Sequence, residues 1–126
     1  MNLPVRALFL AAATMMLAAQ AQAKVVEWSC VFPIVANPNG VTRDQDLKMV
    51  FALDDATGKA KLTENSGTRE VTVIAGQAVI SFLDQMPSGT LRVTAIDAQG
   101  RSVQSRHTMI GNNLLPSQSY GSCTHN

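Results

Sequence analysis

The chain has 126 residues, with ten Lys and Arg, nine Asp and Glu, and a formal net charge of +1 at pH 7. Its length allows a single domain with one hydrophobic core. The charges are scattered without a run of one sign, which argues against the basic stripe of a nucleic-acid-binding protein and against a polybasic membrane patch.

Residues 1–23 have the pattern of a cleavable secretory signal peptide. Arg6 is the one charge before an apolar run over residues 7–19. Ala21 and Ala23 then give the spacing of small residues that signal peptidase requires. The run is shorter than the roughly 20 residues that a membrane-spanning helix needs, which disfavours a retained anchor. We therefore expect cleavage after Ala23, a periplasmic or secreted protein, and no membrane anchor afterwards.

The remaining residues, 24–126, indicate one all-β domain. Short stretches of alternating apolar and polar residues are separated by Gly, Asp, Asn and Pro, which is typical of strands joined by turns. In chain order, we expect strands at residues 25–32, 47–53, 59–64, 69–74, 77–83, 90–97 and 101–110, and a last extended segment at 114–123.

One long connection, residues 33–45, interrupts this pattern. Pro33, Pro38 and Gly40 argue against regular structure in it, so we expect an irregular loop. Long ordered loops in compact domains frequently carry function. This segment is therefore a candidate contact surface for a ligand or partner.

The two cysteines, Cys30 and Cys123, lie in the first and last predicted strands. One cysteine pair in an exported chain of this size predicts a disulfide. The sequence has no C-x-x-C motif, so a redox role is not indicated. Short turns predict antiparallel neighbours, and closing such a meander removes its exposed edges. We expect a small antiparallel up-and-down β-barrel of about eight strands with the disulfide at its seam. A β-sandwich whose disulfide bridges two sheets is the alternative.

The predicted strand at residues 101–110 holds the first candidates for a ligand contact. Alternate residues of a strand share one face, so Val103, Ser105, His107 and Met109 lie together. Because Val103 and Met109 are apolar, we expect this face to point into the barrel. His107 and Ser105 are then either polar contacts in a ligand cavity or a satisfied buried pair.

Two alternatives remain open around this strand. In the opposite register, Gln104, Arg106 and Thr108 point inward. Trp28 and Tyr120, which flank the predicted disulfide in sequence, are either core residues or further ligand contacts, and the Tyr120 hydroxyl is a possible partner for a buried histidine.

An enzyme is the least favoured class. Ser105 and His107 lack a nucleophile elbow, and Asp54 and Asp55 belong to a predicted turn rather than to a carboxylate pair. No spacing of ligand residues matches a zinc motif. We therefore expect no catalytic residues, no metal and no cofactor, and instead a non-enzymatic module that binds an unidentified ligand or protein partner in the cell envelope.

The layout of the chain resembles the small envelope inhibitors of c-type lysozyme, which are exported β-barrels with a disulfide joining the chain ends. Their inhibitory loop, Ser-Gly-Ala-(Lys/Arg)-Tyr, is similar to the segment from Ser66 through Gly67 to Arg69. Glu70 stands where the family has tyrosine. The resemblance implies an alternative function, inhibition of a lysozyme-type hydrolase through this exposed turn.

Overall fold

A computed structural model describes residues 24–126, and the predicted signal peptide at residues 1–23 lies outside the described part. The described chain consists of β-strands and turns, and it contains no helix that is able to cross a membrane. The strands are β1 (Val25–Asn37), β2 (Gly40–Thr42), β3 (Leu47–Asp54), β4 (Lys59–Glu64), β5 (Gly67–Ala75), β6 (Val79–Gln85), β7 (Leu91–Asp97), β8 (Arg101–Ile110) and β9 (Asn113–His125).

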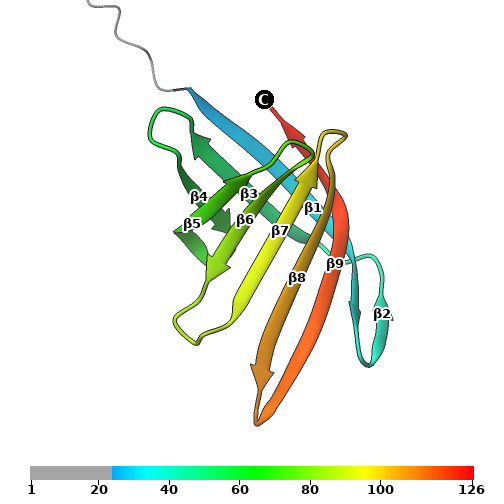
Figure 1. The fold of residues 1–126 in the computed structure, drawn as a ribbon. Coiled ribbons are helices and arrows are strands. Elements are labelled where there is room, and N and C mark those ends of the chain that lie inside the picture. Colours follow the sequence, from blue (N-terminus) through cyan, green and yellow to red (C-terminus); the bar gives the residue numbers. More distant parts are fainter. Residues whose placement is uncertain (1–23) are drawn as a thin grey trace, which may run out of the picture.

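All of these strands except β2 form one closed barrel. From β3 onward each strand pairs antiparallel with the next along the chain, and β1 pairs with both β3 and β9, so that eight strands close the sheet. Figure 1 shows β1, in blue, beside β9, in red. The predicted closed antiparallel meander is confirmed, and the sandwich alternative is wrong.

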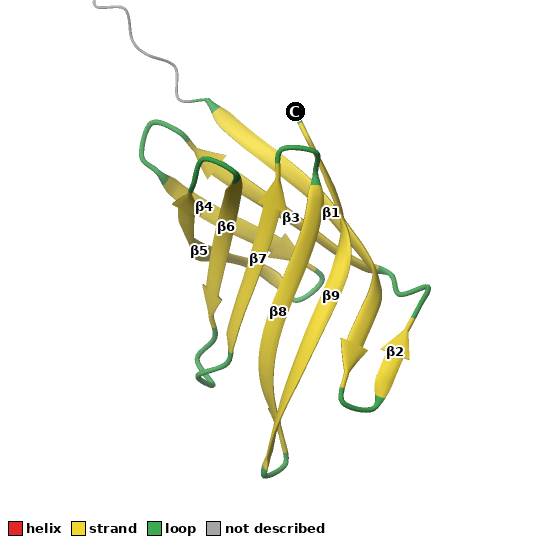
Figure 2. Ribbon diagram, turned by 45° about the vertical axis from the view of Figure 1, so that its right-hand side comes forward, coloured by secondary structure: helices red, strands yellow, loops and turns green. Residues whose placement is uncertain are grey.

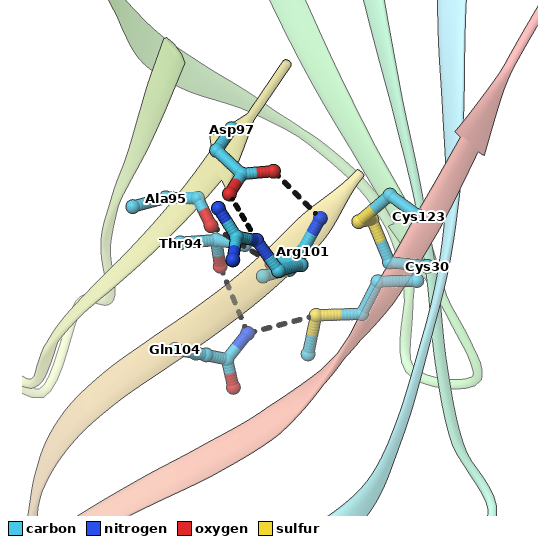
Figure 3. Close-up of a disulfide and its surroundings, with 9 residues drawn as sticks. Cys30, Thr94, Ala95, Asp97, Arg101, Gln104 and Cys123 are labelled. Carbon is cyan, nitrogen blue, oxygen red and sulfur yellow. Dashed lines mark hydrogen bonds and ion pairs between the residues drawn. A yellow bond between two sulfur atoms is a disulfide. The ribbon is translucent and has the colours of Figure 1, made fainter. Parts of the chain in front are cut away.

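The predicted disulfide lies at the barrel seam. Cys30 on β1 is directly opposite Cys123 on β9, and the two sulfurs are bonded (Figure 3). The bond joins residues that are 93 positions apart. For a loop of this size, the chain-entropy model gives a stabilisation of about 4–5 kcal/mol.

Interior packing is apolar in the half of the barrel nearer the termini. The rings of Phe51 and Phe82 stack with centroids 4.4 Å apart, and Trp28 meets Phe82 edge-on at 5.5 Å. Such arrangements add to the free energy gained by burying the rings. The buried apolar residues are Cys30, Phe32, Met49, Phe51, Ala60, Leu62, Val71, Phe82, Ile96 and Cys123.

The expectation of an irregular loop at residues 33–45 is wrong. β1 continues through this segment to Asn37, and β2 returns beside it after a tight turn. Pro33 is tolerated because the register between β1 and β9 shifts between Val31 and Ile34, and a bulge leaves a position whose N–H is not needed by the ladder.

Gly121 allows β9 to pass close to this irregularity in β1. A Cβ atom at position 121 would collide with the carbonyl oxygen of Val31 and with the Cα of Phe32. Bulged strands bend, and β1 departs from the barrel body after this point (Figures 1 and 2).

Two hairpins extend beyond the barrel body at the end opposite the termini (Figure 2). β8 pairs with β7 only as far as Arg106, whereas its pairing with β9 continues to Ile110. The β1–β2 hairpin is held beside this ribbon because residues 34–36 of β1 pair with residues 118–120 of β9. The inner faces of the two hairpins continue the inner face of the barrel and line a cleft between them.

Candidate ligand-binding cleft

Strand β8 turns its polar face into the barrel, which is the reverse of the favoured prediction. Gln104 is only 3% exposed, and its side-chain amide donates to the Thr94 hydroxyl and to the Met49 sulfur, each at 3.0 Å (Figure 3). Val103 and Met109, predicted to be core residues, are 40% and 54% exposed. The polar face can be buried because partners on other strands satisfy its hydrogen bonds.

The four residues predicted to contact a ligand are therefore not gathered in one cavity. His107 is exposed on the outer face of β8, so the expectation that His107 and Ser105 point inward is wrong. Tyr120 also faces outward, where its hydroxyl donates to Gln118 at 2.8 Å, and the Gln118 amide lies 3.5 Å from the Ser105 hydroxyl. Trp28 is inside the barrel, against the core.

A network of four charged side chains occupies the barrel interior toward the end opposite the termini. Asp84, which is buried, accepts hydrogen bonds from Arg69 Nε at 2.8 Å and from Arg92 Nη2 at 2.8 Å. Glu64 accepts from Arg92 Nη2 at 2.7 Å and from Arg69 Nη2 at 3.3 Å. Each carboxylate thus contacts both guanidinium groups, and the network is neutral as a whole.

These contacts shift the titration of both acids. Hydrogen bonds from Arg69, assisted by the charge and hydrogen bonds of Arg92, lower the pKa of Asp84 against the opposing effect of burial. Burial alone would raise the pKa of Glu64, but Arg92 and the hydrogen bonds of Ser66 and Arg69 lower it below its ordinary value. Both carboxylates are therefore ionised at neutral pH.

The segment that resembles an inhibitory loop divides between this network and the surface. Ser66 and Gly67 are exposed at the β4–β5 turn, where the Ser66 hydroxyl donates to Glu64 at 2.9 Å. Arg69 instead points inward to Asp84 and forms a 2.6 Å ion pair with it. Of the three residues, only Ser66 and Gly67 are presented by the turn, and inhibition remains an untested prediction.

A cleft of about 400 Å³ opens between the two extended hairpins. Inner-face residues of β1, β8 and β9 line it together with the β1–β2 turn, so the cleft continues the barrel interior. The lining residues are Val35, Asn37, Pro38, Asn39, Arg106, Thr108, Ile110, Leu115, Pro116 and Ser117.

Arg106 is the one basic residue in the lining of this cleft. Its Nε atom is buried without a hydrogen-bond partner, and among the described residues Arg106 forms no ion pair. Arg92, which is already paired with Glu64 and Asp84, lies on the neighbouring strand β7, directly opposite Arg106. The sequence offered a signal for Arg106 only through the less favoured register of the strand at residues 101–110.

Comparison with known proteins adds no relative. No family model matches the chain, and neither the curated proteins nor the solved structures contain a match. In residues 24–126, no group of three or more His, Cys, Asp or Glu side chains is placed to hold a metal ion.

Proposed function

We propose that this protein is an exported, non-enzymatic binding module whose ligand site is the cleft between the β1–β2 and β8–β9 hairpins. The observation that carries the proposal is the change along the inner face of the sheet. Within the barrel body this face packs a core, whereas beyond Arg106 the same face lines an open volume. A surface that continues a core without being packed is suited to receive a ligand.

The composition of the lining supports a small molecule rather than a protein as the occupant of the cleft. Small-molecule sites have volumes of roughly 300–1,000 Å³ and combine an apolar lining with a few polar groups. The cleft, at about 400 Å³, lies in the lower part of that range. Val35, Ile110 and Leu115 supply apolar walls, and Thr108 and Ser117 supply hydroxyl groups.

The walls of the cleft are held by the sheet itself. Val35 is directly opposite Ser119 on β9, and Thr108 is opposite Leu115 within the β8–β9 hairpin. Backbone ladders of this kind fix the positions of the strands before a ligand arrives, which lowers the entropic cost of binding. Most of the site is therefore held by strands before a ligand arrives, and the β1–β2 turn completes it.

Export supports a role outside the cytoplasm. The disulfide between Cys30 and Cys123 is compatible with an oxidising compartment such as the periplasm. The signal pattern of residues 1–23 agrees with that location. In such a compartment, a barrel with an open cleft is suited to bind a ligand.

The proposal is tested with the neutral apolar fluorophore N-phenylnaphthylamine added to the purified exported protein. We expect its fluorescence to rise on binding to the cleft. Thr108→Trp, which fills the cleft from β8, should abolish the signal. His107→Trp is the matched control, because it places the same ring on the opposite face of the same strand. Absence of binding to the wild-type protein, or equal binding to both variants, would overturn the proposal.

A further inference from the structure

Resting on the proposed function, we infer that the cleft ligand is an organic monoanion whose headgroup, such as a carboxylate, pairs with Arg106 and whose apolar tail lies toward the hairpin tips. The inference depends on the charges inside the barrel, on the neighbours of Arg106, and on the order of polar and apolar residues along the cleft.

The inner face of the sheet carries one more positive than negative charge toward the open end. Its guanidinium groups belong to Arg69, Arg92 and Arg106, and its carboxylates belong to Glu64 and Asp84. All three arginines are at least partly buried. A partly buried cation without a counter-ion is costly, because water that would solvate it is largely excluded.

The two carboxylates do not serve Arg106. The oxygen Oδ2 of Asp84 already accepts from Arg69 at 2.6 Å and from Arg92 at 2.8 Å. Glu64 divides its two oxygens between the same two arginines. The β7–β8 register then sets Arg106 opposite Arg92, a like-charge pair that an added anion would stabilise.

The buried Nε atom of Arg106 indicates which headgroup the cleft would accept. A guanidinium group offers its N–H donors in a planar fork that matches a carboxylate with two parallel hydrogen bonds. Here the Nε donor is buried and unpaired in a side chain that lines the cleft. An anionic oxygen in the cleft would satisfy the donor and the charge together.

The orientation of the ligand follows from the order of residues along the hairpins. Arg106 is the last β8 residue that still pairs with β7, so it lies where the cleft meets the barrel. Thr108 and Leu115, which are directly opposite each other, come next, and Ile110 follows toward the tip of the β8–β9 hairpin. The headgroup is therefore placed deep, and the tail leads outward between the hairpins.

A displacement experiment with the purified exported protein tests this ligand class. Octanoate, octanol and octylamine, which share one chain length, compete with bound N-phenylnaphthylamine. We expect octanoate to displace the fluorophore at a concentration about tenfold lower than octanol, the preference that one charge-assisted hydrogen-bonded pair supplies. Octylamine should be the weakest competitor, because its cation meets Arg106.

Variants of Arg106 make the test specific. Arg106→Gln should remove the preference for octanoate over octanol, measured as the ratio of the concentrations at which the two displace the fluorophore. Arg106→Lys keeps the charge without the planar fork and should retain part of the preference, and thermal melting confirms that each variant is folded. Arg101→Gln is the matched control, because it removes one positive charge from an exposed ion pair with Asp97 on the surface.

The outcomes separate the two levels of the argument. If the fluorophore does not bind the wild-type protein, the proposed function itself fails. If the fluorophore binds but octanol competes as well as octanoate, or if Arg106→Gln keeps the preference, the cleft stands and the anionic ligand class is wrong.

Discussion

The two halves of the barrel interior are filled in different ways. In the half nearer the termini, stacked and edge-on rings of Trp28, Phe51 and Phe82 pack beside the disulfide. In the other half, Asp84 and Arg92 are buried in an ion network, and the sheet continues past them as two hairpins around a cleft. The same pleated sheet thus supports an apolar core at one end and a polar, partly open site at the other.

This difference separates the residues that stabilise the fold from the residues that line the cleft. Burial of rings and closure of the seam contribute stability without reference to any ligand. Buried charged groups at the other end are costly unless they are paired, and Arg106, which forms no ion pair within residues 24–126, lines the cleft. Substitutions in the half nearer the termini should therefore lower the free energy of unfolding, whereas substitutions in the cleft should alter ligand affinity.

The largest effect is expected at the seam. Replacing Cys30 and Cys123 together by Ser removes a cross-link over 93 positions, and the free energy of unfolding should fall by about 4–5 kcal/mol. Urea denaturation of the variant measures the change, and the wild-type protein in reductant should show the same loss. Fluorophore affinity under conditions where the variant is folded should be unchanged. Loss of binding by the folded variant would show that the two halves are coupled.

A smaller loss is expected from the ion network. Asp84→Asn leaves Arg69 and Arg92 to share Glu64, and the free energy of unfolding should fall by about 3 kcal/mol, the lower range for breaking a buried pair. The control combines Asp84→Leu with Arg92→Met. It leaves Arg69 balanced by Glu64 and should recover most of the stability. A double variant less stable than Asp84→Asn would contradict the pairing described for this half.

Acid should weaken the same half. The pKa values of Asp84 and Glu64 are lowered in the folded protein, so the unfolded chain binds protons first as pH falls. Their contribution is fully present above the unfolded values of about 4 and is lost as pH drops through the folded values. The melting temperature should therefore fall between pH 5 and pH 3 in wild-type protein, and fall less in the double variant. A melting temperature constant over this range would contradict the pKa shifts.

The smallest effect is expected on the outer face. His107→Ala removes an exposed side chain that lies away from the cleft, so we expect a change within about 0.5 kcal/mol in unfolding free energy. Fluorophore affinity should also stay the same. His107 does border a second hollow, of about 280 Å³, with Leu91 and Met109. Loss of fluorophore binding in this variant would move the site to that hollow.

The fold was predictable because its signals are local. Alternation and turn residues locate seven of the barrel strands within a few positions, and the cysteines at both ends of the meander indicate the seam. The β2 hairpin was missed because Pro33 is acceptable only in the bulge that Gly121 permits, and that contact joins distant segments.

The site was less predictable, because it depends on partners that are remote in sequence. Gln104 is buried because its side-chain amide donates hydrogen bonds to Thr94 and to Met49, which is 55 positions away. These bonds turn the polar face of β8 inward, opposite to the predicted orientation. Apolar Val103 and Met109 indicated the opposite face, since local pattern weighs hydrophobicity but not satisfaction of hydrogen bonds. Arg106 becomes conspicuous only after Glu64 and Asp84 are known to be paired elsewhere.

Pairing of β1 with β9 also has a consequence for the order of folding. A chain that emerges from a ribosome or a translocation channel presents β1 first and β9 last among these strands. The contacts of the seam have the greatest sequence separation in the domain, and such contacts slow folding because a long loop must close before they form. Until β9 arrives, the edges of β1 and β8 are unpaired and open to other strands. The wait for the final strand is therefore the interval in which a chaperone would protect this protein most.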